Sequence, residues 1–296
     1  MSTVDYAEWS ATCDTLHAHT QLLGKLAVAL APPEPELQHA ALRLTARGWE
    51  TNPLPAPDGS GAVSVALDLR THEARVEATR GDGRRVPLAP DRPVAAVTRE
   101  VLAAVREVAG PVEINPTPQE VSWSVPLDED TEHATYDPEA VAAYFAAATR
   151  VARVLAEVRA PFRGRSTPVN AWWGSFDLAV VLFSGRPAEP PSNDFIMRNA
   201  MDAQEVSLGW WPGNTGYGHA AFFAYAHPTP EGFAGADVSP GRWDADLGEH
   251  VLDWDGSGDA APALTFLRKA FHHAGRTSGW DPDLARTAEG IPPPVT

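Results

Sequence analysis

Cysteine is scarce in this chain of 296 residues, and long apolar runs are absent from it. Cys13 is the single cysteine, which excludes an internal disulfide. The opening residues MSTVDYAEWS lack the basic and apolar regions of a secretory signal, so we expect a cytoplasmic protein. No apolar run approaches the roughly 20 residues that span a bilayer, and we therefore expect no membrane partner.

Sequence motifs for cofactors and nucleophiles are missing as well. Neither GxxxxGK[ST] nor GxGxxG after a strand occurs, so nucleotide and dinucleotide cofactors have no support. GxSxG, HExxH and paired CxxC patterns are also absent. His17 and His19, like His272 and His273, are spaced so that a helix points the two members of each pair to different sides. The sequence therefore predicts no cofactor and no metal site.

Positive charge is in short supply, because 23 basic residues face 39 acidic ones and the net charge is −16. Such a chain repels phosphate backbones, and no basic stripe is interleaved with aromatic residues. Nucleic acid is therefore disfavoured as a partner. What the chain has in abundance is hydrophobic residues, at 44%, which can bury a substantial core.

The hydrophobic pattern predicts an α+β fold with two antiparallel β-sheet units, each flanked by helices, so that a helix–four strands–helix order occurs twice. The predicted helices cover residues 7–30, about 92–109, 137–160 and ALTFLRKAFHHA. The predicted strands are ALRLTA, a segment near Asn52, AVSVALDL and EARVEATR in the first unit, and 168–173, 176–184, 204–211 and 219–227 in the second. A short strand, VEINP, follows the first unit, and RTHE and RGDGR are predicted turns.

The domain organisation follows from this order. Residues 1–115 form an N-terminal α+β unit, and the prolines in 116–136 predict an irregular crossing. Residues 137–296 form a C-terminal α+β unit that carries the candidate pocket. A single compact globule is the alternative to two domains.

Polar residues recur along one side of the first predicted helix. Asp14, His17, Gln21 and Lys25 are three or four residues apart and therefore share a stripe. Two interpretations remain open, a solvated face or one wall of a pocket.

The stretch NAWWGSFD predicts a hairpin with Gly174 and Ser175 as a two-residue turn in which glycine supplies the positive φ. Trp173 then pairs with Phe176, and Trp172 lies opposite Asp177. One face of the hairpin is apolar and should pack on the core, through Val169, Ala171, Trp173, Phe176, Leu178, Val180 and Leu182. The other face is mixed and carries Asn170, Trp172, Asp177, Ala179, Val181 and Phe183.

The mixed face is too apolar to be solvated, so we expect it to be covered. Its polar groups indicate either a satisfied hydrogen-bond network or a site with a few convergent polar groups. Neighbouring strands extend the pattern with Glu205, Ser207 and Trp211, and with Tyr225 and His227. We expect Trp172 and Asp177 to face a cavity shared with Glu205 or Tyr225.

Several segments of the sequence resemble one family over nearly the whole chain. They are TLHAHTQLLGKLAVALAPP, LRLTARGWETNPLP, VPLDEDTEHATYDPEAV, FRGRSTPVNAWWGSFDLAVVLFSGRP, EVSLGWWPG and AAFFAYAHPTPEGF. The chain resembles DUF5996, a bacterial family of unknown function. The resemblance implies that histidine is usual at the positions of Asn170 and Gln204, two side chains that form hydrogen bonds but do not titrate near neutral pH.

The functional hypothesis is a metal-independent, cofactor-independent enzyme that isomerises, cyclises, dehydrates or hydrolyses a small apolar or aromatic metabolite. Asp177 and Glu205 are the candidate proton carriers with His133 as a partner, because apolar surroundings raise carboxyl pKa values toward the useful range. The candidate substrate-binding residues are His17, Asn170, Trp172, Gln204, Trp211, Tyr225 and His227. The alternative is a non-catalytic protein that binds a small molecule or assembles through these aromatic residues, for example as a homodimer.

Overall fold

The computed structural model describes residues 4–284 and contains two antiparallel sheets flanked by helices, which confirms the predicted α+β class. The N-terminal sheet has the strand order β1-β2-β4-β5-β6, with β3 paired to β4. Its strands are β1 (Arg43–Leu44), β2 (Gly48–Glu50), β3 (Leu54–Pro55), β4 (Ala62–Asp68), β5 (Glu73–Ala78) and β6 (Gly83–Pro87).

The C-terminal sheet also has six strands, in the order β11-β12-β10-β9-β8-β7. They are β7 (Asn170–Trp172), β8 (Asp177–Pro187), β9 (Ala203–Trp211), β10 (Ala221–His227), β11 (Arg242–Asp244) and β12 (Glu249–Asp253). The helices are α1 (Tyr6–Leu30), α2 (Val94–Ala109), α3 (Pro138–Arg159), α4 (Phe195–Ala200) and α5 (Ala261–Thr277), with 3₁₀ turns η1 (Pro35–Ala40), η2 (Phe233–Gly235) and η3 (Pro282–Leu284).

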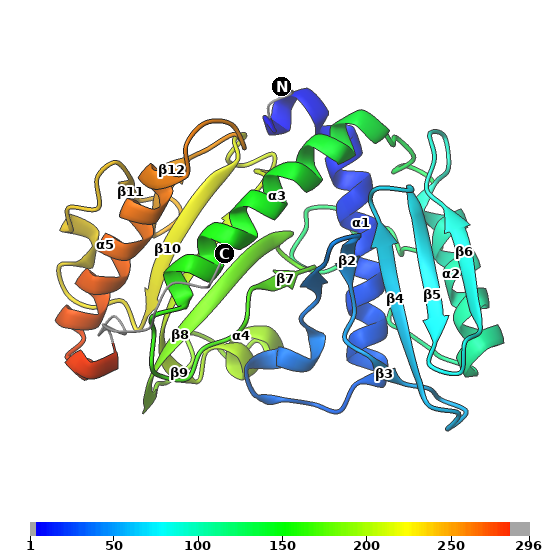
Figure 1. Cartoon of the computed structure of the whole chain (residues 1–296), viewed down its shortest axis with the longest axis horizontal. Helices are drawn as coiled ribbons and strands as arrows, with labels where there is room; N and C mark the ends of the chain where they lie inside the picture. The colour runs from blue at the N-terminus through cyan, green and yellow to red at the C-terminus, as the bar shows by residue number, and fades with distance from the viewer. Residues whose placement is uncertain (1–3, 285–296) are drawn as a thin grey trace, which may run out of the picture.

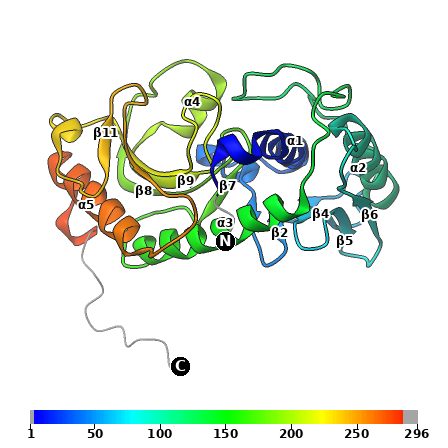
Figure 2. The same cartoon turned by 90° about the horizontal axis from the view of Figure 1, so that it is seen from above.

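The helices lie on different sides of the two sheets. Figure 1 shows α1 between the two sheets, and α2 packs beside α1 on strands β5 and β6 of the N-terminal sheet. Seen from above, α3 and α5 lie on one side of the C-terminal sheet and α4 lies on the other (Figure 2). The side of the sheet that carries α4 is therefore not covered by a long helix. None of the helices in residues 4–284 combines the length and the apolar character that a membrane span requires.

Local sequence signals explain where the two longest helices begin. The Asp5 carboxylate accepts a hydrogen bond from the Ala7 backbone N–H at the start of α1, at 3.2 Å. At the start of α3, Asp137 accepts from the Glu139 N–H at 2.9 Å, and Pro138 occupies the first turn. Both caps satisfy backbone donors that a helix leaves unpaired at its N-terminus.

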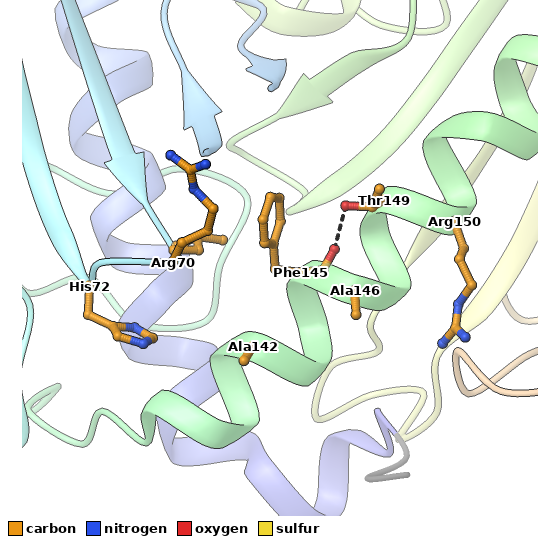
Figure 3. A pocket seen from close by; sticks show the side chains of 8 residues that line it. Arg70, His72, Ala142, Phe145, Ala146, Thr149 and Arg150 are labelled. Carbon is orange, nitrogen blue, oxygen red and sulfur yellow. Dashed lines mark hydrogen bonds between the residues drawn. The ribbon is translucent and has the colours of Figure 1, made fainter. Parts of the chain in front are cut away.

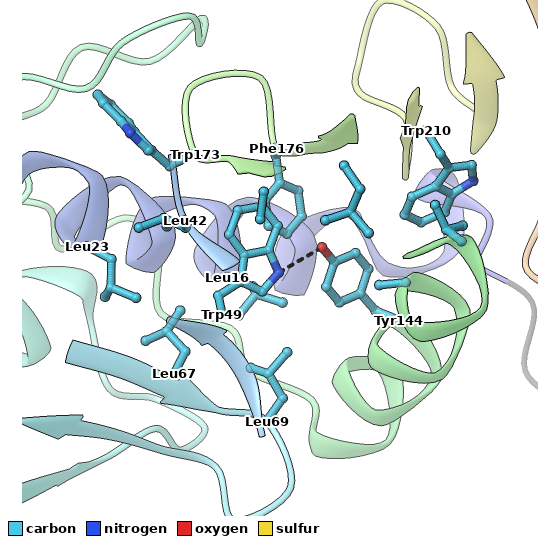
Figure 4. Packing of buried hydrophobic residues seen from close by; sticks show 14 of the residues in the cluster. Leu16, Leu23, Leu42, Trp49, Leu67, Leu69, Tyr144, Trp173, Phe176 and Trp210 are labelled. Carbon is cyan, nitrogen blue, oxygen red and sulfur yellow. Dashed lines mark hydrogen bonds between the residues drawn. The ribbon is translucent and has the colours of Figure 1, made fainter. Parts of the chain in front are cut away.

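The core joins the two predicted units. Its buried side chains form one contiguous cluster that includes Leu16 of α1, Trp49 of β2 and Trp210 of β9. Figure 4 shows the centre of this cluster, where the Trp49 indole N–H donates to the Tyr144 hydroxyl at 3.1 Å. The division into domains at 116–136 remains a prediction.

Several strand predictions were wrong. VEINP is not a strand, because Pro111 and Pro116 flank it and remove backbone donors that a ladder needs. RGDGR is a turn only in part, since Gly83 begins β6. ALRLTA is a strand only at Arg43–Leu44, and the segment near Asn52 is split between β2 and β3.

The β11–β12 hairpin was missed altogether. The segment RWDADLGEHVLD is rich in charged residues, as loops often are. Its hairpin features are Gly248, with φ at 70°, and the alternation around Val251. Each sheet therefore has six strands and not the four that were predicted.

Candidate functional site

The β7–β8 hairpin has the predicted register but not the predicted turn. Trp172 pairs with Asp177 and Asn170 pairs with Ala179. The ladder ends at Trp172 and Asp177, so four residues connect the strands, and the positive φ belongs to Phe176 at 57° and not to Gly174. This conformation turns the Phe176 ring into the core, where it stacks on Trp49 and Tyr144 with centroids 5.2 Å apart in both cases. That packing offsets the cost of a left-handed backbone at a bulky residue.

Glycine is required at position 174 for a different reason, because the proline-rich crossing at 116–136 passes close to the turn. A Cβ atom at this position would overlap the carboxylate of Glu120. Glu120 is exposed as a residue, but its carboxylate end is desolvated, which raises its pKa. Its charge also raises the pKa of Asp177, so Glu120 belongs to the electrostatic surroundings of the candidate site.

The polar stripe of α1 is buried against this crossing, so the interpretation as a solvated face was wrong. The Gln21 amide donates to the backbone oxygens of Gln119 at 2.8 Å and Trp173 at 3.1 Å, and its oxygen accepts from the Gln119 N–H at 3.1 Å. Lys25 Nζ donates to Gln119 Oε1 at 2.9 Å, and desolvation lowers the pKa of this amine to about 8. These side chains join α1, the crossing and the hairpin turn.

His17 completes the same contact. Its Nε2 lies 2.9 Å from the carbonyl oxygen of Trp173 and 3.0 Å from that of Gly174, so this nitrogen carries the proton and donates. Burial lowers the pKa of His17 to about 4, and the ring is therefore neutral at physiological pH. Its ring also stacks on Phe176. These contacts support the turn, and substrate binding by His17 remains a prediction.

Asn170 is equally well satisfied. Its side chain is completely buried, its amide donates to Gln38 Oε1 at 2.9 Å, and its oxygen accepts from an Arg43 Nη. Both polar ends of the amide therefore connect β7 to the segment that includes η1 and β1. These bonds satisfy the Asn170 side chain, and substrate binding by Asn170 remains a prediction.

The polar groups of the mixed face lie on adjacent strands. Phe183 pairs with Glu205, Val181 with Ser207, and Ser207 in turn with Tyr225. Glu249 belongs to the same face, because it precedes by two residues Val251, which pairs with Phe223. We call this set the acidic face; its members are Asp177, Glu205, Ser207, Tyr225 and Glu249, with the aromatic residues Trp172, Trp211 and Phe223.

The side chains of Asp177 and Glu205 are buried and that of Glu249 is half-buried, and the three have few or no hydrogen-bond partners. Glu205 is 3% exposed and Asp177 is 6% exposed. Asp177 accepts a hydrogen bond from the Ser175 hydroxyl, whereas Glu205 and Glu249 accept none from any residue in the described part of the chain. Burial raises the pKa of Asp177 and of Glu249 to about 7 and that of Glu205 to about 8.

The charges of all three carboxyl groups affect the pKa of Tyr225. Its pKa is raised first by burial and then by the negative charges of Glu205, Glu249 and Asp177, and its hydroxyl faces Ser207. Three carboxyl groups thus act on one hydroxyl, although they come from strands β8, β9 and β12. Asp177 and Glu205 lie toward opposite ends of the face, because Glu205 pairs with Phe183, six residues along β8 from Asp177.

The cation that affects the pKa of Glu205, Arg165, is already paired. Arg165 Nη1 contacts Glu36 Oε2 at 2.6 Å, and its guanidinium lies 3.7 Å above the centroid of Phe183. The Glu36 charge raises the pKa of Glu205 and the Arg165 charge lowers it, and burial outweighs both. Glu205 therefore has no counter-ion of its own.

Aromatic rings surround the carboxyl groups. The Trp211 ring lies 5.7 Å from Phe223, and Phe223 is nearly parallel to Tyr225 at 6.1 Å. Gly209 permits this arrangement, because a Cβ there would overlap the Phe223 ring. Trp172, Trp211 and Tyr225 are each partly buried, so the face combines acids with apolar surface that solvent reaches in part.

Two predicted site residues lie apart from this group, and a third, His227, shares its face but bonds a carbonyl oxygen elsewhere. His133 Nδ1 bonds Asp130 Oδ2 at 2.7 Å, next to Asp14, and it is not among the groups that perturb Asp177 or Glu205. Gln204 alternates with Glu205 along β9 and so faces the opposite side of the sheet. His227 pairs with Glu205 across the ladder, but its Nε2 bonds the Glu189 carbonyl oxygen at 2.9 Å.

Two surface cavities lie away from the acidic face. One, of about 460 Å³, is shown in Figure 3 between the β4–β5 turn, with Arg70 and His72, and Phe145 of α3. The other, of about 490 Å³, is lined by residues of α5. Neither includes a residue of the acidic face, so a cavity at Asp177 remains a prediction.

Sequence reasoning missed Glu249 and Glu120. The alternation in EHVLD was the signal for Glu249, but the strand itself was not predicted. Glu120 lies in an irregular segment, and no local pattern places it on the turn. Within residues 4–284, no three His, Cys, Asp or Glu side chains are grouped to hold a metal ion.

Comparison with known proteins gives one match. A family described as "Family of unknown function (DUF5996)" matches residues 1–287 of the chain. No curated protein and no solved structure matches it.

Proposed function

Because the chain belongs to the DUF5996 family, which has no known function, we propose a function from the acidic face itself. The proposal is an enzyme that does acid/base chemistry on a small apolar or aromatic metabolite, without a metal or other cofactor. Isomerisation, cyclisation, dehydration and hydrolysis all fit this chemistry.

The observation that supports the proposal is the lack of hydrogen-bond donors around buried Glu205. Burial of a carboxyl group disfavours its charged form unless donors compensate, so a structural role would normally include donors. The chain supplies such donors to Asn170 but not to Glu205. Groups that are costly for stability are typical of functional sites.

Each residue has a proposed role in this chemistry. Glu205 and Asp177 are the proposed proton carriers, because their pKa values of about 8 and about 7 lie close to neutral pH. Glu249 and Tyr225 hold further exchangeable protons beside them. Trp172 and Trp211 offer ring faces to an apolar substrate.

The test uses solvent deuterium as a label for acid/base chemistry. The purified protein is incubated in D₂O with a fractionated small-molecule extract, and mass spectrometry follows each compound. We expect at least one compound to be converted or deuterated by the wild type. General acid–base catalysis typically contributes about 100-fold or more, so the Asp177→Asn and Glu205→Gln variants should each slow that change by at least this factor.

Glu231→Gln is the matched control, because Glu231 is exposed on the loop after β10 and not part of the acidic face. It should act like the wild type. Equal conversion by the Asp177→Asn/Glu205→Gln double variant would rule out these carboxyl groups as the proton carriers.

A non-catalytic binding protein is the second candidate, and the partly exposed rings of Trp172, Trp211 and Tyr225 favour it. The two functions differ in one result. A compound that is retained on the wild type and on the double variant alike, with no conversion or deuteration by either, supports binding alone.

A further inference from the structure

The outer side of α5 gathers basic side chains in an otherwise acidic protein. The surface cavity of about 490 Å³ is lined by five basic residues together with Thr265 and Asp237. The five are Arg268, Lys269, His272, His273 and Arg276. Figure 2 shows α5 at one end of the molecule, beside the C-terminal sheet.

Helical spacing explains the grouping. Arg268, His272 and Arg276 are four residues apart and form one line along the helix, and Lys269 and His273 form the neighbouring line. The sequence prediction that His272 and His273 point to different sides was incomplete, because both reach the same cavity.

The acidic residues nearby do not balance this charge. Arg268 contacts Glu157 of α3 at 2.9 Å and Lys269 contacts Asp237 at 3.6 Å, and such exposed pairs contribute little. Within the described chain, neither Arg276 nor His272 forms an ion pair. Among residues 4–284, the charge of Arg276 at the cavity is therefore uncompensated.

Two observations show that these basic side chains lack favourable partners. The pKa of His272 is lowered first by burial and then by the charges of Arg268 and Arg276, so these groups repel one another. The Nε2 atom of His273 is buried without a hydrogen-bond partner. An anion in the cavity would relieve the repulsion and could accept from the side chains that line it.

We propose that this cavity binds a phosphate group, either as the free ion or as part of a small phosphorylated metabolite. Arginine, lysine and histidine donors are the side chains that recognise phosphate oxygens. The volume lies in the range of small-molecule sites. The net charge of −16 opposes the approach of a long polyanion, so a small ligand fits better than nucleic acid.

The test is calorimetric titration of the full chain with inorganic phosphate and with glucose 6-phosphate, with sodium chloride holding the ionic strength constant. We expect saturable binding at one site. Arg276→Gln and His272→Gln should each weaken it, with Arg276→Gln weakening it at least tenfold. Tighter binding of the inorganic ion would identify free phosphate as the ligand, and tighter binding of the sugar phosphate would identify an esterified one.

Arg153→Gln is the matched control, because Arg153 is an exposed residue of α3 outside the cavity and the charge change is the same. It should leave the affinity unchanged. Absence of saturable binding to the wild type, or equal weakening by Arg153→Gln, would overturn the proposal.

Discussion

The β7–β8 hairpin separates two polar regions that are built differently. At the turn, Gln21 and His17 of α1 bond the backbone of Gln119, Trp173 and Gly174. On the acidic face, Glu205 and Glu249 are desolvated but accept no hydrogen bond from the described residues. The first region stabilises the fold, and the second costs stability, which is why we place the function there.

The largest expected effect comes from breaking the satisfied region. Gln21→Leu keeps the approximate volume but leaves the Gln119 N–H and the Gln119 and Trp173 carbonyl groups without this partner. We expect a loss of about 3 kcal/mol in the free energy of unfolding, because unpaired buried polar groups are costly. Urea denaturation measures this loss. A change below about 0.5 kcal/mol, the usual range for surface substitutions, would show that the contact is not structural.

Asn170→Ala should have the next largest effect. It removes the partner of Gln38 and of Arg43, and we expect a loss of about 2 kcal/mol by the same urea measurement. Asn170→His is the informative companion, because a neutral imidazole can donate through one nitrogen and accept through the other. We expect it to cost less than the alanine variant. If both variants are as stable as the wild type, Asn170 does not belong to the satisfied region.

At alkaline pH, substitution of Glu205 in the acidic face should increase stability, whereas the two substitutions above decrease it. The folded-state pKa of Glu205 is raised to about 8, so its contribution to stability is present at low pH and is lost as the pH rises through about 8. Glu205→Gln removes the charge and should therefore stabilise the protein at about pH 8.5 relative to its effect at about pH 5. Melting temperatures of both proteins at the two pH values test this. A pH-independent difference would contradict the raised pKa.

The smallest effect on stability is expected for Asp177→Asn at pH 6. The amide keeps the shape of the side chain and can still bond Ser175, so the free energy of unfolding should change by less than about 1 kcal/mol. Circular dichroism should show unchanged secondary structure. Unfolding of this variant would make Asp177 a structural residue like Gln21.

The predictable parts of the molecule are those with strong local signals. Two helices were predictable, α1 from its hydrophobic period and α3 from the Asp137-Pro138 start. The hairpin register was predictable from the apolar alternation around Leu178. The α1 stripe shows the limit of such reasoning. Spacing places His17 and Gln21 on one side of the helix, but only the path of the crossing makes that side buried.

The candidate site was harder to predict, because its groups come from segments far apart in the chain. Asp177 and Glu205 follow from strand alternation, whereas Glu249 depends on the unpredicted pairing of β10 with β12. His133 was assigned to the site from its residue type alone, and the fold pairs it with Asp130 instead. Non-local pairing and irregular segments carry no local sequence period that would reveal such contacts.

The most direct test of the account is an NMR titration of protein labelled with ¹³C at the side-chain carboxyl carbons of aspartate and glutamate. Glu205→Gln and Asp177→Asn assign the two resonances. The account predicts that Glu205 titrates with a pKa of about 8 and Asp177 with a pKa of about 7. Titration of both groups in the ordinary range for carboxyl groups, near about pH 4, would show that they are solvated or satisfied and would contradict the assignment of the acidic face as the functional site.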